Sequence, residues 1–238
     1  MVVADYCFPA DVTQRMMREA ASFIVLDHHA SAQAELAGVG DEYKVFNMLQ
    51  SGATLSWNYF HGADVPAFFR YIEDKDIWRW ALTSSREFSA GFMLPFTFEA
   101  WDAVFSKGDA GVASIVAAGE TILAYQQSVI QSHVRKAVPC VMKAAPTWRG
   151  MIVNATLLSS EIGNVLATLP DVDYALMWSL NHSNPVFSCS LRSASDDIDV
   201  SLLAKQFGGG GHRRASGFGF SGTHIHELLL SLNGKPLA

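Results

Sequence analysis

Two short apolar runs near the start of the chain each end in an acidic residue, and a helical pattern separates them. Residues 1–4 lead to Asp5, and residues 23–26 lead to Asp27-His28. Residues 11–21 have helical spacing. Strand, helix and strand at this spacing predict a βαβ unit with a parallel sheet. Ligands of such sheets bind beyond the carboxyl ends of the strands, where the acidic residues are expected to lie.

The middle of the chain has mainly helical patterns. Residues 41–80 indicate helix, with a helix start near residues 51–53. Residues 112–136 form a stretch with few helix breakers, which as a helix would extend roughly 40 Å. Pro139 and the segment 144–150 indicate a domain boundary. The long helix is therefore expected to connect two domains.

The second half of the chain repeats strand and helix patterns. Strands are expected at residues 151–154, 174–180 and 186–191, the last two adjacent, and helices from Ser159, with serine as N-cap, and at residues 199–207. The predicted fold is α/β. A doubly wound parallel-sheet domain spans residues 1–137, including the connecting helix, and a smaller α/β domain spans residues 148–238.

Composition and charge narrow the class of protein. Half of the 238 residues are hydrophobic, 17% are charged and the net charge is −6. A protein that holds long duplex nucleic acid by charge is usually basic, so a nucleic-acid substrate is expected to be short. Three cysteines without paired spacing fit a reducing compartment. No apolar run reaches 18 residues and no leader pattern opens the chain, which predicts a soluble, cytoplasmic protein with no membrane partner.

The acidic and histidine residues at the strand ends form a candidate metal shelf. Carboxylate oxygens suit Mg²⁺ and Mn²⁺, and Mn²⁺ also accepts imidazole nitrogen. Asp5, Asp27, His28 and His29 supply both kinds of group. A further acidic cluster, residues 73–76, is either part of this site or a solvated loop.

A glycine run in the second half suggests a phosphate-binding turn. Residues 208–211 are all glycine, and His212, Arg213 and Arg214 follow. Four glycines are costly to order, which favours close approach of backbone amides to a ligand. Guanidinium groups could then bind a phosphate, and Arg192 would end a nearby strand. A tight structural turn with exposed arginines is the alternative.

The strings VLDHHAS (25–31) and FGGGGHRRASGF (207–218) resemble the two signatures of the DHH/DHHA1 phosphoesterase superfamily. The superfamily includes RecJ-type exonucleases, nanoRNases, pAp phosphatases and cyclic-dinucleotide phosphodiesterases. The order and separation of the strings extend the resemblance over nearly the whole chain. It implies an active site in the cleft between two domains, with two Mn²⁺ or Mg²⁺ ions.

The resemblance also implies roles for individual residues. Asp5 would bridge two metals and His28 would bind one, and Asp27, His28 and His29 form the expected catalytic group. Asp27 could orient an imidazole, and His29 could instead face the substrate or a neighbouring helix. Asp74 is favoured as the last metal ligand, with Asp76 as the alternative. A small-residue turn like residues 51–54 would lie beside the metals. The expected substrate-binding residues are Asn154, Arg192, Gly209, Gly210, Gly211, His212 and Arg213, although Asn154 could equally bond only to backbone.

One family motif has no counterpart in the chain. Members carry a His-x-x-x-Asp-Gly-like motif on the strand before the one that ends at Asp5, so this chain is expected to hold one metal and to hydrolyse weakly. The predicted function is a metal-dependent phosphodiesterase, nanoRNase-like, that acts on short oligonucleotides or nucleotides from one end. The alternatives are an exopolyphosphatase-like hydrolase, a non-catalytic nucleotide-binding protein and an inactive fragment. The oligomeric state stays open, with a homodimer as one option.

Overall fold

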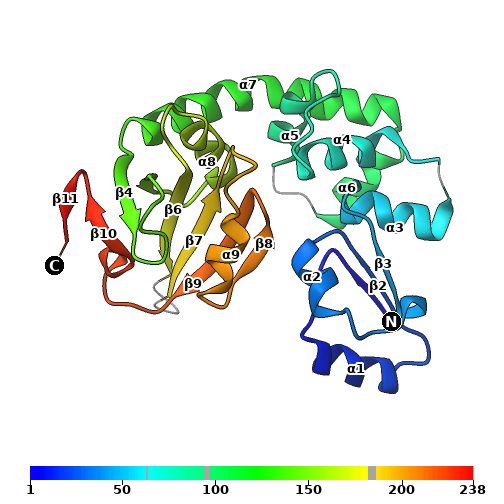
Figure 1. The fold of residues 1–238 in the computed structure, drawn as a ribbon. Helices are drawn as coiled ribbons and strands as arrows, with labels where there is room; N and C mark the ends of the chain where they lie inside the picture. Colours follow the sequence, from blue (N-terminus) through cyan, green and yellow to red (C-terminus); the bar gives the residue numbers. More distant parts are fainter. Residues whose placement is uncertain (63, 94–96, 182–185, 238) are drawn as a thin grey trace. The chain divides into compact units, whose positions relative to one another are not determined.

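The computed structural model describes residues 1–62, 64–93, 97–181 and 186–237 (Figure 1). The chain divides into a first unit, Met1–Gln126, and a second unit, Gln127–Ala238. The division lies inside the long helix α7 (Asp109–Val134), which confirms the expected long helix. Each unit is described by itself.

The first unit is built on a parallel sheet with strand order β1-β2-β3 (Figure 1). Its elements are β1 (Val2–Ala4), α1 (Ala10–Glu19), β2 (Ile24–Asp27), α2 (Ala30–Glu35), the 3-10 helix η1 (Asp41–Tyr43), β3 (Lys44–Phe46), α3 (Gly52–His61), α4 (Ala67–Asp76), α5 (Ser85–Phe92) and α6 (Phe98–Phe105), followed by α7. β1, α1 and β2 confirm the predicted βαβ unit.

Both faces of this sheet are covered. On one face Val3 and Val25 pack with Leu36, which follows α2, and with Met16 of α1. On the other face Leu26 packs with α3. Successive residues of β2 therefore point into opposite cores, and all four residues of this strand are buried.

Residues 41–80 were expected to be mostly helix, and the strand β3 at residues 44–46 was not predicted. The strand is short and only half-buried, so its hydrophobic pattern is weak. The charged residue Lys44 is tolerated in this strand because its ammonium group donates to the carbonyl oxygens of Leu36 and Val39, at 2.9 and 2.6 Å.

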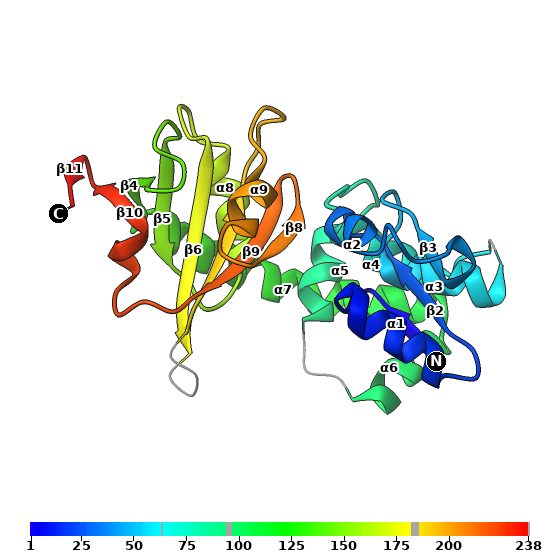
Figure 2. The ribbon, with the colours of Figure 1, turned by 60° about the horizontal axis from the view of Figure 1, so that its bottom comes forward.

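The second unit is built on an eight-stranded mixed sheet with strand order β11-β10-β4-β5-β6-β7-β9-β8 (Figure 2). β5 pairs with β6 in parallel, and the other described pairs are antiparallel. Its elements are β4 (Val138–Met142), β5 (Gly150–Asn154), α8 (Ser159–Ala167), β6 (Tyr174–Asn181), β7 (Val186–Arg192), α9 (Val200–Lys205), β8 (Gly210–His212), β9 (Ala215–Phe220), the 3-10 helix η2 (Ile225–Leu228), β10 (Leu229–Leu232) and β11 (Lys235–Pro236).

Helices cover both faces of this sheet as well. Leu176 of β6 packs with α9 in one core, and Ala175 and Met177 pack with α8 and the end of α7 in the other. The neighbouring strands β6 and β7 were predicted as adjacent, and their antiparallel pairing confirms this.

Two expectations in the second unit are wrong. Pro139 does not mark a boundary but lies in β4, opposite Met151. β10 pairs with residues 140–142 of β4, so the proline stands where this ladder ends and its missing N–H costs no hydrogen bond there. The N-cap of α8 is Leu158, in a left-handed conformation with φ of 55°, and Ser159 is the first helical residue.

Among the described residues, no helix combines the length and the apolar composition needed to cross a membrane.

Candidate metal centre

His28 lies between two carboxylates in the first unit. Its Nε2 atom is 3.1 Å from Oδ1 of Asp5 and 3.4 Å from Oδ2 of Asp76. Asp5 follows β1, His28 follows β2 and Asp76 ends α4, so three elements meet at this point. The imidazole is buried, whereas the side chains of Asp5 and Asp76 are 53% and 39% exposed. The arrangement is a shelf of three donor groups that opens to solvent.

Asp5 has a backbone conformation that orients its side chain at the end of β1. Its φ is 56°, in the left-handed region, and its N–H donates to the Leu26 carbonyl at 2.9 Å. Gly52 packs against it so closely that a Cβ on Gly52 would lie 2.5 Å from Cβ and 2.6 Å from Oδ1 of Asp5. Only glycine fits at position 52. The small-residue turn expected beside the metals therefore does contact Asp5.

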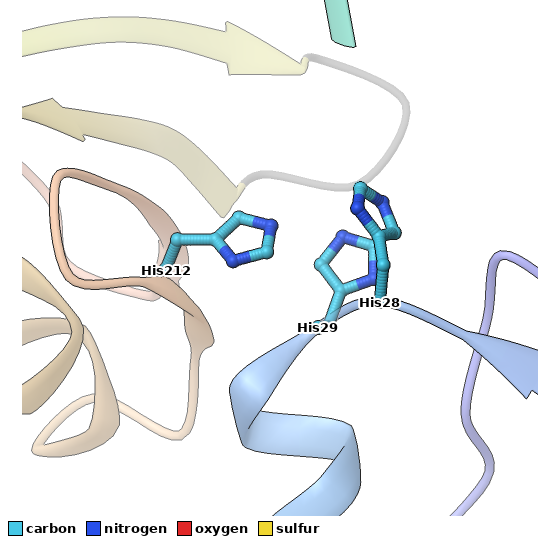
Figure 3. A group of neighbouring side chains, drawn as sticks. All are labelled: His28, His29 and His212. Atoms are coloured by element: carbon cyan, nitrogen blue, oxygen red, sulfur yellow. The ribbon is translucent and has the colours of Figure 1, made fainter. Parts of the chain in front are cut away.

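Asp27 organises the segment that carries the two histidines. Its Oδ1 atom accepts from the backbone N–H of His28 at 2.6 Å and of His29 at 3.1 Å, and it lies 2.7 Å from Nδ1 of His29. Figure 3 shows His28 and His29 beside each other. Their ring centroids are 4.5 Å apart. His212, also drawn there, belongs to the second unit.

The Asp27–His29 pair shifts the pKa of both groups. Burial alone would raise the pKa of Asp27, but the hydrogen bonds from His29 and from the backbone amides lower it overall. The hydrogen bond to Asp27 raises the pKa of His29, and burial opposes this more weakly. The pair is therefore a carboxylate bonded to an imidazole that takes up a proton readily.

The structure brings Asp76, and not Asp74, to His28. Asp74 is 1% exposed, and its carboxylate accepts from the backbone N–H groups of Ala81 at 2.9 Å and Leu82 at 3.1 Å. Both carboxylate oxygens of Asp74 thus hold the following loop. The preference for Asp74 over Asp76 is therefore corrected by the geometry.

The donor set fits a divalent cation. Burial raises the pKa of Asp76, and the nearby Asp5 carboxylate adds to this while His28 opposes it. Asp5, Asp27, His28 and His29 each offer one ligand atom within 4.8 Å of the others. Oδ2 of Asp27 is buried and has no hydrogen-bond partner among the described residues. A cation would relieve the repulsion between the carboxylates and satisfy this oxygen.

The glycine run of the second unit is explained in large part by strand packing. Gly208 has a φ of 75° and lies in the turn that follows α9, with its N–H bonded to the Lys205 carbonyl. A Cβ on Gly209 would lie 2.1 Å from the Gly217 carbonyl oxygen, and one on Gly211, whose φ is 133°, 2.6 Å from that of Ala215. The run therefore lets β8, which contains Gly210 and His212, lie directly on β9.

The arginines that follow the run pair with an acidic loop of the same unit. Arg213 donates to the Asp196 carbonyl and lies 3.4 Å from the Asp199 carboxylate. Arg214 forms an ion pair with the Asp196 carboxylate. This matches the alternative of a structural turn for Arg213 and Arg214.

Arg192 ends β7 and Asn154 ends β5, the two strands of the second unit that flank β6. The Arg192 guanidinium donates to the Ser160 hydroxyl at 2.7 Å and to the Leu191 carbonyl at 2.8 Å. The Asn154 amide donates to the Trp178 carbonyl at 2.9 Å, so it does bond to backbone. His212 is half-buried, and its carbonyl accepts from the Ser216 hydroxyl at 2.7 Å.

Comparison with known proteins gives two sequence relatives and a shared fold. No family model matches the chain. It is 32% identical over 227 residues to the uncharacterized protein R106 of Acanthamoeba polyphaga mimivirus, across 93% of this chain and 53% of that protein. It is 38% identical over 81 residues to oligoribonuclease NrnB of Bacillus subtilis, across 34% of this chain and 19% of NrnB.

Among solved structures, an exopolyphosphatase-related protein from Bacteroides fragilis matches with a TM-score of 0.51 and 15% identity, over 94% of this chain and 66% of that one. This similarity concerns the fold. The chain spans about half the length of the viral relative and a smaller share of NrnB.

Sequence, geometry and comparison point in the same direction. The first signature string carries a histidine between two carboxylates, the second forms the β8–β9 turn, and the sequence relatives include an oligoribonuclease. The chain resembles the DHH/DHHA1 phosphoesterase superfamily in both signature strings, is similar in sequence to an oligoribonuclease over about a third of its length, and shares the fold of an exopolyphosphatase-related protein.

Proposed function

We propose that the protein is a divalent-metal-dependent hydrolase of phosphate esters. The observation that carries this is the convergence of Asp5, His28 and Asp76 at one point of the first unit. These three residues would hold the metal, which supplies a water of lowered pKa and neutralises charge on phosphate oxygens. Mn²⁺ is the ion we favour, because the donor set mixes imidazole with carboxylate.

The chain's own groups have separate tasks in this proposal. Asp27 fixes the orientation of His29 through a 2.7 Å contact. His29, with its raised pKa, is suited to carry a proton toward a leaving oxygen. Arg192 and His212 of the second unit are proposed to bind the end of the substrate.

We propose a short oligonucleotide or a nucleotide as substrate, cleaved from one end. The net charge of −6 supports a short substrate, and one relative is named an oligoribonuclease. An exopolyphosphatase-like activity is the second candidate, because a protein of the same fold is described as exopolyphosphatase-related. The ion pairs of Arg213 and Arg214 with Asp196 and Asp199 argue against it, since a polyphosphate chain needs many available cations.

The test is a Mn²⁺-dependent assay with a labelled trinucleotide and, in parallel, with inorganic polyphosphate. This chain and the longest natural form that contains it are compared. We expect trinucleotide hydrolysis that Asp76→Asn abolishes. Hydrolysis that survives removal of every divalent cation would overturn the proposal, and release of phosphate from polyphosphate alone would favour the second candidate.

A further inference from the structure

Glu73 connects helix α4 to the turn that precedes α3. Its Oε2 atom accepts from the Thr54 hydroxyl at 2.5 Å and from the backbone N–H of Ser51 at 3.3 Å. The Ser51 hydroxyl in turn contacts the Thr54 hydroxyl at 2.6 Å and accepts from the Thr54 N–H at 3.1 Å. The first turn of α3 is thus fastened to one carboxylate.

Arg79 contacts both Glu73 and the turn that precedes α3. Its guanidinium lies 3.2 Å from Oε1 of Glu73 and donates to the Leu49 carbonyl, also at 3.2 Å. Both oxygens of Glu73 are therefore engaged, and residues 49–54 are held at two places. A bridging arginine with two defined partners restricts this turn more than a single surface ion pair would.

The loop that carries Arg79 is strained and held by Asp74. Trp78 and Trp80, on either side of Arg79, have φ values of 59° and 55°. Such conformations are unfavourable for residues other than glycine. The Asp74 carbonyl accepts from the N–H groups of Arg79 at 2.8 Å and Trp80 at 3.1 Å. Strain that is maintained in this way often accompanies a functional constraint, and here it places Arg79 on Glu73.

The connection ends at two of the three donor groups of the metal centre. Gly52, inside the fastened turn, is the residue against which Asp5 packs. Asp76 lies three residues after Glu73 on α4, and positions i and i+3 of a helix share a face. We infer that Glu73 is a positioning residue, which sets the separation of Asp5 and Asp76 for one divalent cation; this rests on the proposed function.

The test measures Mn²⁺ affinity of the full chain by the loss of the free-ion signal in electron paramagnetic resonance. The variants are Glu73→Gln, which weakens the Arg79 contact, and Thr54→Val, which keeps the shape of a buried residue but removes its hydroxyl. Glu19→Gln is the control, because Glu19 is an exposed carboxylate of the same unit, paired with Arg15. Substitution of residues that orient metal ligands typically lowers metal affinity 10- to 100-fold. We expect a loss of about tenfold or more for both variants and none for the control.

Thermal unfolding of the metal-free proteins separates positioning from folding. We expect Thr54→Val without metal to unfold cooperatively at a somewhat lower melting temperature, so that it is fully folded where its reduced Mn²⁺ affinity is measured. If Glu73→Gln does not fold, the Mn²⁺ affinity of Thr54→Val alone tests the inference. Unchanged Mn²⁺ affinity in the folded variants overturns the inference alone, whereas no Mn²⁺ binding by the unmodified chain overturns the proposed function and the inference with it.

Discussion

At the scale of single residues, the geometry of the candidate metal centre involves a glycine as well as charged groups. Asp5 holds its side chain in place through a left-handed backbone, and Gly52 leaves the space that this side chain occupies. The dependence is steric, so it can be tested without changing any charge.

Gly52→Ala is expected to displace Asp5 and to lower Mn²⁺ affinity by about tenfold or more, the range found when groups behind metal ligands are removed. The added Cβ would lie 2.5 Å from the Asp5 side chain. Gly38→Ala is the matched control, because a Cβ there would meet nothing within 4 Å. Calorimetric titration with Mn²⁺ measures the affinity of both variants. Equal affinities would show that the contact with Gly52 does not determine the position of the Asp5 side chain.

His28→Ala and Asp76→Asn are expected to abolish the rise in melting temperature that Mn²⁺ gives, because each removes a donor from the shelf. Asp74→Asn is expected to keep that rise but to lower the free energy of unfolding by about 1–3 kcal/mol, since it disturbs a buried acceptor of two amides. Thermal unfolding with and without Mn²⁺ distinguishes these patterns. If Mn²⁺ no longer raises the melting temperature of Asp74→Asn, Asp74 is a metal ligand after all.

The acidic cluster shows what a linear pattern can and cannot predict. Glu73, Asp74 and Asp76 look equivalent in the sequence. On α4, however, Glu73 and Asp76 share one face by their i, i+3 spacing, while Asp74 points elsewhere and holds its own loop. Asp5 and His28 could be predicted because each ends a strand. The choice of Asp76 as the third carboxylate could be made only once the structure showed that α4 ends at Asp76, beside His28.

At the scale of elements, caps and close strand contacts determine the second unit. Asp199 is the N-cap of α9, and its carboxylate accepts from the N–H and hydroxyl of Ser201 at 3.0 and 2.6 Å. Arg213 lies beside it. This cap therefore holds both the helix that leads to the glycine run and the turn that follows the run.

Asp199→Asn is expected to remove a pH-dependent part of the stability. Burial alone would raise the pKa of Asp199, but the hydrogen bonds of Ser201 lower it below its usual 3.8. A carboxyl whose folded pKa is depressed stabilises above its unfolded pKa, and this contribution is lost as pH falls through the folded pKa. Urea unfolding between pH 5 and about pH 2 should therefore show a smaller loss of stability in the variant. Exposed Asp197→Asn is the control; if the two behave alike, the cap is not the cause.

The predictable elements are those whose hydrophobic pattern is long or repeated. β1, α1 and β2 follow from apolar runs around a helical stretch, and β6 and β7 from two runs near each other in the sequence. β3 has only three half-buried residues, and β4 contains a proline, so neither has a distinct pattern. Their conformation is decided by pairing, of β3 with β2 and of β4 with β5 and the remote strand β10.

At the scale of the whole molecule, the two units have separate cores and should respond to different changes. Gly150 faces buried Tyr174, whose hydroxyl accepts from the Met142 N–H at 3.0 Å, and a Cβ on Gly150 would lie 2.1 Å from that ring. Gly150→Ala is expected to cost the second unit about 1–3 kcal/mol by overpacking. Scanning calorimetry should show Mn²⁺ raising one transition and Gly150→Ala lowering another. A single transition that both changes shift equally would show that the units unfold as one.

The ion pairs of Arg213 and Arg214 have a consequence for how the protein responds to ionic strength. A binding protein that neutralises phosphates releases counterions, and its affinity for a single strand falls with salt by a slope of about −0.7 per phosphate contacted. Arginines already neutralised by Asp196 and Asp199 release few such ions. Arg213 and Arg214 should therefore add little to the salt dependence of trinucleotide binding, and any dependence that is measured would come from Arg192 and the proposed metal site.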